Sequence, residues 1–233
     1  MDIAEKTLQL KQDFDEVYTA GKKSQYDEFW DDYQQNGNRT NYTFAFSGAG
    51  WTKDNLKPKY KVVPLNNAQG GSQMFDRCNM NGSEPIDFSL IADKFDFSNI
   101  EYGYNLFYSA KIENIIADLS KATSLGGAFT NGWGVYNTKN ITIKVNENVT
   151  MTNTFTALLE NLFFMEGSKI GKSITVNSKL LTKTSILSIV EHLTTTASGQ
   201  TVTLSKTAKE KAFTDSEWST LIATKPNWTF SLA

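Results

Sequence analysis

Beyond about residue 65, apolar and polar positions follow one another in an imperfect repeat. Each repeat places a phenylalanine after a short turn-rich stretch, at Phe75, Phe107, Phe129 and Phe155, with spacings of 32, 22 and 26 residues. After three of these phenylalanines a short apolar run follows, at residues 112–116, 141–145 and 174–176. Such runs between turn residues predict strands with a buried side.

One strand per 20 to 30 residues, joined by short arcs, is the spacing of a solenoid. A single coil cannot bury its inner side alone, so its large apolar residues must pack on those of neighbouring coils. The four phenylalanines are therefore expected in the core and not at a ligand. The predicted fold class is α+β, with a short N-terminal helical segment, a small β region, and an irregular β-solenoid with a C-terminal cap.

The first 36 residues predict two helices with different apolar stripes. One stripe recurs at helical spacing among acidic residues and lysines, at Ile3, Leu10, Phe14 and Val17. Its narrow seam is suited to self-association or docking, and folding back onto its own domain is the other interpretation. A second, aromatic stripe follows Gly21 and ends near Gly37. Residues 1–36 are thus a candidate segment for assembly and oligomerisation.

Two further regions complete the predicted organisation. Residues 37–64 form a short β connector, in which a strand at 42–46 stops at a glycine turn. Residues 65–233 form the solenoid, whose cap begins at about residue 178. Within the cap, Thr182 is the expected N-cap of one helix, and Thr214 with Glu217 matches the capping box of another.

Charge and composition narrow the classes of partner. The 233 residues carry a net charge of −2, without the basic excess expected of a nucleic-acid binder. This total averages an acidic head, with 4 Lys/Arg against 9 Asp/Glu in residues 1–36, and a basic end, with 8 against 4 in residues 169–233. One Cys and one His argue against a disulfide framework and a His/Cys zinc site, so no cofactor is expected.

The chain opens on an acidic helical stretch, without the basic and apolar regions of a signal peptide. It contains no run of eighteen apolar residues, so no membrane insertion is expected. Six Asn-x-Ser/Thr sequons occur, among them those at Asn41, Asn140 and Asn148. Without a signal peptide they are interpreted as polar turns and not as glycan sites.

Several of these residues resemble a known family. Phe75, Phe107 and Phe129, each followed by a small residue and then Leu or Ile strand positions, resemble BspA-type leucine-rich repeats. Residues 181–187, 201–204 and 223–228 are similar to the closing segment that such repeats carry in phage and prophage proteins of Gram-positive gut bacteria. Residues 29–37 and 46–51 are similar to the leader of these repeats in phage structural proteins. The resemblance implies a leucine-rich-repeat-like solenoid in a virion protein.

The chain also departs from that family. Pro226-Asn227-Trp228 stands where the family tail has Lys-Gly-Trp, which alters the turn into the last strand. Cys78 fills the cysteine-like repeat position, and Ala110 and Gly132 stand at its counterparts. The family carries no catalytic motif that transfers to positions in this chain.

Few side chains are candidates for catalysis. His192 has no serine, aspartate or cysteine partner nearby in the sequence and is expected on a helix surface. Cys78 is expected as a buried thiol of the repeat core. Asp93, Asp96 and Glu101 fall in one turn-rich stretch, where their ordinary role is that of solvated turn residues. A carboxylate pair roughly 5–9 Å apart would instead serve glycoside hydrolysis.

Aromatic residues in Gly/Asn-rich turns are the candidate binding surface. They are Trp51, Tyr102, Tyr104, Trp133 and Tyr136, with residues 132–136 as the preferred surface loop. Exposed rings beside amide side chains suit sugar stacking or protein contact. The alternative is that these rings fill the irregular arcs of the solenoid.

Together these features predict a bacteriophage or prophage virion protein, from a tail, baseplate or fibre, and no enzyme. Its head would bind other virion proteins and form a homo-oligomer, with a trimer as one candidate. Several copies side by side would multiply weak contacts to a host-surface glycan or protein. Synthesis in the host cytoplasm without a signal peptide, followed by release at lysis, fits a virion. A cell-surface leucine-rich-repeat adhesin and a fibre-borne polysaccharide depolymerase are the two alternatives.

Overall fold

The computed structural model of the chain describes residues 47, 63–64, 70–78, 85–90, 92, 95–130, 138–155 and 158–233. All of them fall within the unit Asn38–Ala233. The predicted head helices in residues 1–36 and the predicted strand at 42–46 lie outside the described residues and stay predictions.

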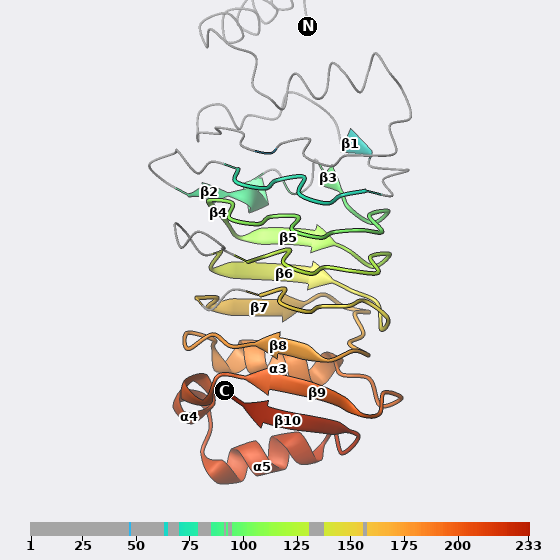
Figure 1. The fold of residues 1–233 in the computed structure, drawn as a ribbon. Helices are drawn as coiled ribbons and strands as arrows, with labels where there is room; N and C mark the ends of the chain where they lie inside the picture. Colours follow the sequence, from blue (N-terminus) through green and yellow to red (C-terminus); the bar gives the residue numbers. More distant parts are fainter. Residues whose placement is uncertain are drawn as a thin grey trace, which may run out of the picture. The chain divides into compact units, whose positions relative to one another are not determined.

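The described elements are short strands, joined toward the C-terminus by helices (Figure 1). In chain order they are β1 (Val63–Pro64), β2 (Ile86–Asp87), the 3₁₀ helix η1 (Phe88–Leu90), β3 (Phe95–Asp96), β4 (Ile112–Glu113), β5 (Ile115–Asp118), β6 (Asn140–Lys144), β7 (Asn161–Phe164), β8 (Ile174–Val176), α3 (Lys183–His192), β9 (Gln200–Leu204), α4 (Lys206–Ala212), α5 (Asp215–Ala223) and β10 (Trp228–Leu232).

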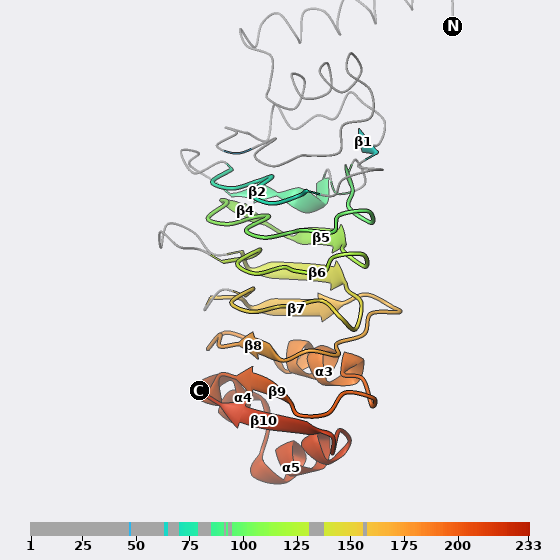
Figure 2. The same ribbon diagram turned by 45° about the vertical axis from the view of Figure 1, so that its right-hand side comes forward.

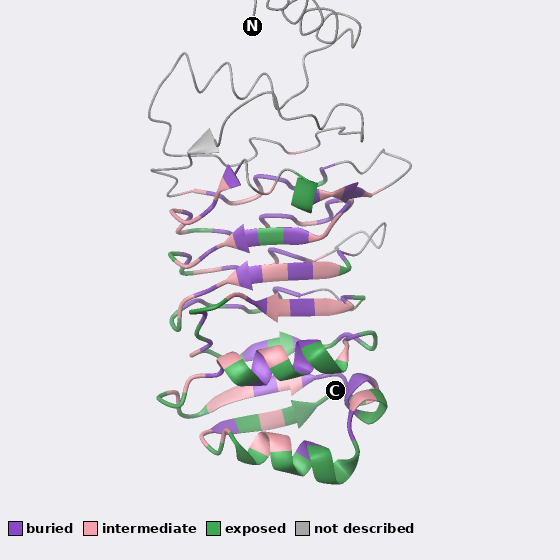
Figure 3. Cartoon of the chain, turned by 180° about the vertical axis from the view of Figure 1, so that it is seen from behind, coloured by how far each residue is buried: buried purple, intermediate pink, exposed green. Residues whose placement is uncertain are grey.

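The described strands pair in parallel, each with a segment about one repeat away. They form four separate sheets, ordered β1-β3, β2-β4, β5-β6-β7 and β10-β9-β8. Buried residues recur at every second position along β5, β6 and β7 (Figure 3), as the period-two pattern predicts. The predicted leucine-rich-repeat-like β-solenoid is wrong, since the described residues hold several small parallel sheets and no closed one. The physical reason is that left-handed backbone and a helix interrupt the strand ladder.

The predicted phenylalanine core is confirmed. The rings stack in sequence order with centroid distances of 4.9, 5.7 and 6.0 Å and interplanar angles of 9°, 15° and 9°, through Phe75, Phe107, Phe129 and Phe155. All four side chains are buried. The residue two positions before each ring has a positive φ, namely Gln73, Asn105, Gly127 and Asn153. The same left-handed turn therefore precedes every ring, although the repeats differ in length.

The predicted apolar strand at 112–116 is two strands. Asn114 has a φ of 54° and bends the backbone between β4 and β5. Asparagine tolerates this left-handed region better than most residues with a side chain. β4 consequently pairs with β2, and β5 pairs with β6. One bend of the backbone thus separates two sheets that the sequence pattern joins.

Helix α3 ends the sheet β5-β6-β7. It packs against β7, and Figures 1 and 2 show it below that strand, where a further strand of the ladder would lie. Ser185 Oγ accepts a hydrogen bond from the Leu162 amide at 3.0 Å, and Ser188 Oγ accepts one from the Phe164 amide at 3.1 Å. These serine hydroxyls replace strand carbonyls, so part of the hydrogen-bonding edge of β7 is satisfied.

From β8 onward, the strands continue a series of parallel pairings that is separate from the sheet β5-β6-β7. A line of isolated parallel bridges joins Gly70, Tyr102, Ser124 and Thr150 in successive repeats. The bridge between Met151 and Ile174 connects this line to β8, which then pairs with β9, and β9 with β10. In Figure 1, β5 to β7 point to the right and β8 to β10 point to the left. The last sheet therefore extends the line of bridges and not the sheet β5-β6-β7.

An asparagine ladder runs along the sheet β5-β6-β7. Asn140 Nδ2 donates to Asn114 Oδ1 at 2.6 Å, and Asn161 Nδ2 donates to Asn140 Oδ1 at 2.7 Å. Thr182 Oγ1 donates to Asn161 Oδ1 at 2.9 Å, which ties the ladder to the start of α3. The asparagines are half-buried, where an unpaired amide group costs free energy. The sequon residue Asn140 thus bonds on both sides to equivalent positions of its neighbours.

The two predicted helix starts are confirmed. Thr182 is the N-cap of α3 and accepts a hydrogen bond from the Ser185 amide. Thr214 and Glu217 form the capping box of α5, because each side chain accepts from the other residue's backbone amide. Both caps satisfy amides that have no partner within their helix.

Helix α4 was not predicted, since its sequence shows no apolar stripe. It is held by the buried residues Ala208 and Lys209, and the ammonium group of Lys209 forms an ion pair with Asp215 at the start of α5. This ion pair lowers the pKa of the Asp215 carboxyl below its usual range. The buried Lys209 side chain thus helps to hold α4, where an amphipathic helix would bury a row of apolar side chains.

Acid is expected to loosen the start of α5. Hydrogen bonds from the Thr214 amide and from Lys183 lower the pKa of Glu217 from 4.5 to about 2. A carboxyl whose pKa is lowered by folding stabilises the fold above its unfolded pKa, and this contribution is lost as pH falls through the folded pKa. We expect the urea midpoint of the wild type to fall from pH 4.5 toward pH 2 more steeply than that of a Glu217→Gln variant. Equal acid sensitivity of the two proteins would contradict this account.

Candidate binding face

Tyr102 and Tyr104 lie on the outer side of one segment, with 52% and 54% of their surfaces exposed. Gly103 between them is buried, and a Cβ at this position would come within 2.6 Å of Leu125 Cδ2. The Gly103 amide donates to the Ser124 carbonyl of the next repeat at 2.9 Å. The alternation of exposed, buried and exposed residues directs both rings to the same side. These two rings therefore do not fill the interior.

Small residues flank both rings in the neighbouring repeats. Tyr102 pairs with Gly70 on one side and with Ser124 on the other. A Cβ at Gly126 would lie 3.3 Å from Tyr104 Cδ2, so the Tyr104 ring lies over this glycine. The two rings consequently stand beside residues that lack long side chains, which leaves them open to contact from outside.

Outward-facing hydroxyl groups continue from the two tyrosines along the line of bridges and into the last sheet. The bridge Met151–Ile174 and the registers of β8, β9 and β10 align them in two rows. We call these rows the hydroxyl face. Eleven of its positions carry a hydroxyl group and Gly126 carries none: Tyr102, Ser124, Thr150, Ser173, Thr201 and Thr229 form one row, and Tyr104, Gly126, Thr152, Thr175, Thr203 and Ser231 form the other.

The hydroxyl face has a uniform chemistry. None of its twelve positions carries a charged side chain. Part of its hydrogen-bonding capacity is used internally, since Ser173 Oγ donates to Gln200 Oε1 at 2.9 Å and accepts from the Thr201 amide at 2.9 Å. An uncharged surface of hydroxyl groups with two aromatic rings at one end suits a ligand with uncharged polar groups.

The other predicted contact residues lie outside the described part of the chain. This holds for the aromatic residues Trp51, Trp133 and Tyr136 of the predicted binding surface. It also holds for the predicted oligomerisation seam of Ile3, Leu10, Phe14 and Val17. For these residues the predictions stay predictions, and Tyr102 and Tyr104 are the members that the structure places together.

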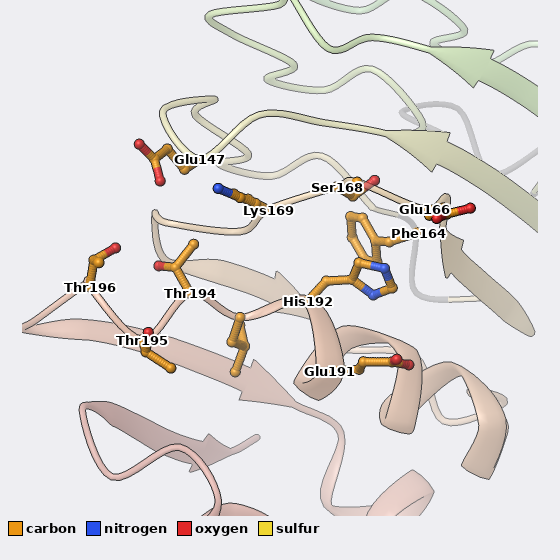
Figure 4. A pocket seen from close by; sticks show the side chains of 12 residues that line it. Glu147, Phe164, Glu166, Ser168, Lys169, Glu191, His192, Thr194, Thr195 and Thr196 are labelled. Carbon is orange, nitrogen blue, oxygen red and sulfur yellow. The ribbon is translucent and has the colours of Figure 1, made fainter.

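A groove of about 650 Å³ lies beside the end of α3 (Figure 4). It is lined by Glu147, by Phe164, by the turn 166–169 and by residues 191–196. His192, expected on a helix surface, is half-buried at this groove. Its Nδ1 lies 2.8 Å from the Ser188 carbonyl oxygen, and its ring centroid lies 5.8 Å from that of Phe164. The imidazole is thus held on two sides at the groove wall.

The loop that forms one wall of the groove is held by side chains from the C-terminal segment. Lys225 Nζ donates to the carbonyls of Glu191 and Leu193, at 3.1 and 2.6 Å. Asn227 Nδ2 donates to the Thr194 and Ala197 carbonyls, at 3.0 and 2.6 Å. Trp228 Nε1 donates to the Thr194 carbonyl at 2.8 Å. The Asn227 side chain therefore holds this loop through its amide group, a role that a glycine could not supply.

Burial of Lys225 has an electrostatic consequence. Desolvation lowers the pKa of its ammonium group below the usual range, and the nearby Glu191 carboxylate opposes this effect. The ammonium still donates to two carbonyls at the end of α3, where the helix dipole favours positive charge. Lys225 thus acts as a C-terminal cap for that helix.

The carboxylates considered for glycoside hydrolysis have other surroundings. Asp96 Oδ1 accepts a hydrogen bond from the Ser98 amide at 3.0 Å, and Asp87 and Asp118 make the same turn contact with Ser89 and Ser120. This is the Asx turn that aspartate favours. Glu101 is half-buried, and Asp93 lies outside the described residues. Asp96 is therefore a turn residue, like Asp87 and Asp118.

Two buried titratable groups lie near the start of the phenylalanine stack. Cys78 is fully buried, as expected of a core thiol, and burial raises its pKa far above the usual range. Asp76 is also buried, and neither of its carboxylate oxygens has a hydrogen-bond partner among the described residues, although Arg77 Nη1 lies 3.6 Å from Oδ2. Desolvation raises the pKa of Asp76, and Arg77 acts in the opposite direction. The sequence pattern had not singled out Asp76.

Comparisons with protein-family models, with curated proteins and with solved structures find no match for this chain. Within the described ranges, no group of three or more His, Cys, Asp or Glu side chains is placed to hold a metal ion. None of the helices in the described part is long and apolar enough to cross a membrane. A function for this chain therefore has to follow from its own residues.

The hydroxyl face was not predicted, although the sequence contains part of its signal. Triplets with polar outer residues and an apolar centre recur at 150–152, 173–175, 201–203 and 229–231. Each triplet indicates a strand with a polar outer side. The sequence pattern does not show that the triplets align in two rows, because the alternation within one strand does not identify which strand lies beside it.

Proposed function

We propose that this chain is a structural and binding component of a bacteriophage virion, in the tail, baseplate or fibre, and that its hydroxyl face contacts the host surface. The observation that carries the binding role is the pair of half-exposed tyrosines at one end of an uncharged, hydroxyl-rich face. The resemblance of residues 29–37 and 181–187 to phage proteins supports the virion. Residues 1–36 would contact other virion proteins and bring copies together.

The architecture favours contact through a broad surface. Backbone hydrogen bonds join each repeat to the next, for example Gly103 to Ser124 and Asn105 to Gly126, both at 2.9 Å. Outer residues on such a backbone lose little conformational freedom when a ligand binds, which lowers the entropic cost. Individually weak contacts would then add up along the face and across the copies of an oligomer.

Proteomics of purified particles tests the virion assignment. Phage or prophage particles from a strain that carries the gene would be banded on a density gradient, digested and analysed by mass spectrometry. We expect peptides of this chain in the particle band, in constant ratio to known particle proteins across the gradient. Peptides found on intact cells but absent from particles would overturn the proposal in favour of the adhesin.

Removal of both exposed tyrosine rings is expected to weaken host binding. The double variant Tyr102→Ala/Tyr104→Ala removes the aromatic end of the hydroxyl face, and exposed aromatic residues contribute strongly to binding surfaces. We expect binding of the labelled full chain to host cells to weaken about tenfold or more, measured by flow cytometry. Because both side chains are half-exposed, the thermal midpoint should change little.

The matched control is a double variant with apolar truncations elsewhere on the surface. Leu90→Ala/Leu187→Ala removes two side chains that are 60% and 40% exposed and do not belong to the hydroxyl face. It should bind cells as the wild type does. If the tyrosine variant also binds as the wild type does, the hydroxyl face is not the contact surface.

A further inference from the structure

We infer that the hydroxyl face binds an extended, uncharged polysaccharide chain that runs along its two rows, across the strands. This inference rests on the proposed function, because it names the ligand of the same face. It is carried by three observations: free hydroxyl groups at regular spacing, an aromatic ring that leans along one row, and the lack of charge at all twelve positions of the face.

Most hydroxyl groups of the face are available to a ligand. The side chains of Thr150, Thr152, Thr175, Thr229 and Ser231 are exposed. Their hydroxyl groups form no hydrogen bond with any other described residue. Ser173 differs, since its hydroxyl group bonds to Gln200 and to the Thr201 amide. A ligand can therefore bond to several hydroxyl groups without breaking contacts within the protein.

The two rows have the length and shape of an extended polymer. Neighbouring positions of a row lie on paired segments about 4.8 Å apart, so the six positions of each row span about 24 Å. The two rows are two residues apart along each strand, which corresponds to about 7 Å. The face is therefore a long, narrow strip, and a chain that lies along it meets a hydroxyl group at nearly every step. A compact ligand would use only one or two of these steps.

Tyr104 supplies an aromatic platform at the start of one row. A Cβ at Gly126, the next position of this row, would lie 3.3 Å from Tyr104 Cδ2 and 3.6 Å from Cε2. The ring thus leans over Gly126 in the direction of the row, and 54% of the Tyr104 surface is exposed. A sugar that stacks on this ring would lie in line with the hydroxyl groups that follow, from Thr152 onward.

The chemistry of the face favours a neutral sugar polymer over other polymers. A side-chain hydroxyl both donates and accepts a hydrogen bond, and so does a sugar hydroxyl. No position of the face carries a cationic group that would attract an anionic polymer, or a carboxylate that would attract a cationic one. An added polypeptide strand pairs with the edge of a sheet, whereas the rows cross the face of strands that already pair with one another.

Fractionation of the host envelope tests the class of ligand. Envelope material from the cells of the binding assay would be separated into neutral polysaccharide, charged polysaccharide and protein. Each fraction would be immobilised, and binding of the full chain would be measured by biolayer interferometry. We expect saturable binding to the neutral polysaccharide and at least tenfold weaker binding to the other two fractions. Binding to the charged or protein fraction alone, or to none of the three, would overturn the inference.

The length of the bound fragment tests whether the ligand runs along the rows. The neutral polysaccharide would be partly hydrolysed, separated by size and titrated into the full chain by calorimetry. Affinity should rise with fragment length and level off once the fragments exceed about 24 Å, the span of each row. Equal affinity of the shortest and the longest fragments would contradict binding along the rows.

A double variant far from the tyrosines tests the direction of the ligand. Thr175→Val/Thr203→Val removes two hydroxyl groups from the row of Tyr104, three and four steps from its ring. Neither hydroxyl group bonds to another described residue, so the thermal midpoint should not fall. We expect long fragments to bind about tenfold more weakly, while the shortest fragments, held at Tyr104, bind as before. Tyr102→Ala/Tyr104→Ala should weaken the binding of both.

Thr142→Val/Thr207→Val is the matched control. These two threonines are half-buried and lie outside the hydroxyl face, and their hydroxyl groups also bond to no described residue. The control should bind long fragments as the wild type does. If the Thr175/Thr203 variant does so too, the ligand does not run along the rows and the inference is refuted.

The two sets of experiments distinguish the ligand from the contact surface. Loss of cell binding in the tyrosine variant, together with binding to the protein fraction alone, would leave the hydroxyl face as the contact surface and reject the polysaccharide. Unchanged cell binding in the tyrosine variant would reject the contact surface itself.

Discussion

Replacement of Phe107 by alanine is expected to lower the free energy of unfolding by about 4 kcal/mol. Phe107 is 1% exposed, and its ring lies between those of Phe75 and Phe129, at centroid distances of 4.9 and 5.7 Å. It also meets the ring of Phe88 edge to face at 5.3 Å. Removal of the ring would leave a cavity in the middle of the stack, where neighbouring repeats cannot close without breaking their backbone ladder. Urea unfolding followed by circular dichroism would measure the change.

Phe163→Ala is a control of the same residue type. Phe163 is half-buried on the outer side of β7, so its truncation removes less contact and leaves no enclosed cavity. Its cost should be less than half that of Phe107→Ala. If the two variants lose equal stability, the stack of rings is not the main source of cohesion between repeats.

Replacement of Asn140 by alanine is expected to cost about 2 kcal/mol. The variant leaves Asn114 Oδ1 without its donor and Asn161 Nδ2 without its acceptor, and both residues are half-buried. A polar group left unpaired away from water loses more free energy than a hydrogen bond contributes. The loss would appear as a lower urea midpoint, with faster amide exchange along β6 and β7.

The sequon at Asn148 supplies the matched control. Asn148 has the same sequence motif as Asn140, but its side chain is exposed in the turn after β6. Asn148→Ala should change the free energy of unfolding by less than about 0.5 kcal/mol. Equal effects of the two substitutions would show that the asparagine ladder adds nothing beyond local turn preference.

Features that depend on one segment at a time could be predicted from the sequence. The spacing of the phenylalanines placed Phe75, Phe107, Phe129 and Phe155 in the core, and the structure confirms it. The N-cap at Thr182 and the capping box at Thr214 were predicted because their hydrogen bonds close within three residues. Alternation and capping are local properties, so a single sequence contains them.

The candidate site was predictable only in part. Tyr102 and Tyr104 could be identified as aromatic residues in turns, but their shared outer side depends on the buried Gly103 and on the ladder to Ser124. His192 could be identified as the only histidine, and its place at a groove depends on residues of three separate segments. Sites of this kind arise from residues that are distant in the sequence.

The sequence by itself determined which side chains face inward, where two helices begin and that the chain repeats. Only the tertiary structure decided which segments are neighbours: Asn114 splits one predicted strand, and α3 takes the place beside β7. It also decided that Lys225, Asn227 and Trp228 hold the groove wall. The physical reason is that a period of two specifies the buried side of a strand, whereas its partner is selected by hydrogen bonds and packing across 20 to 34 residues of chain.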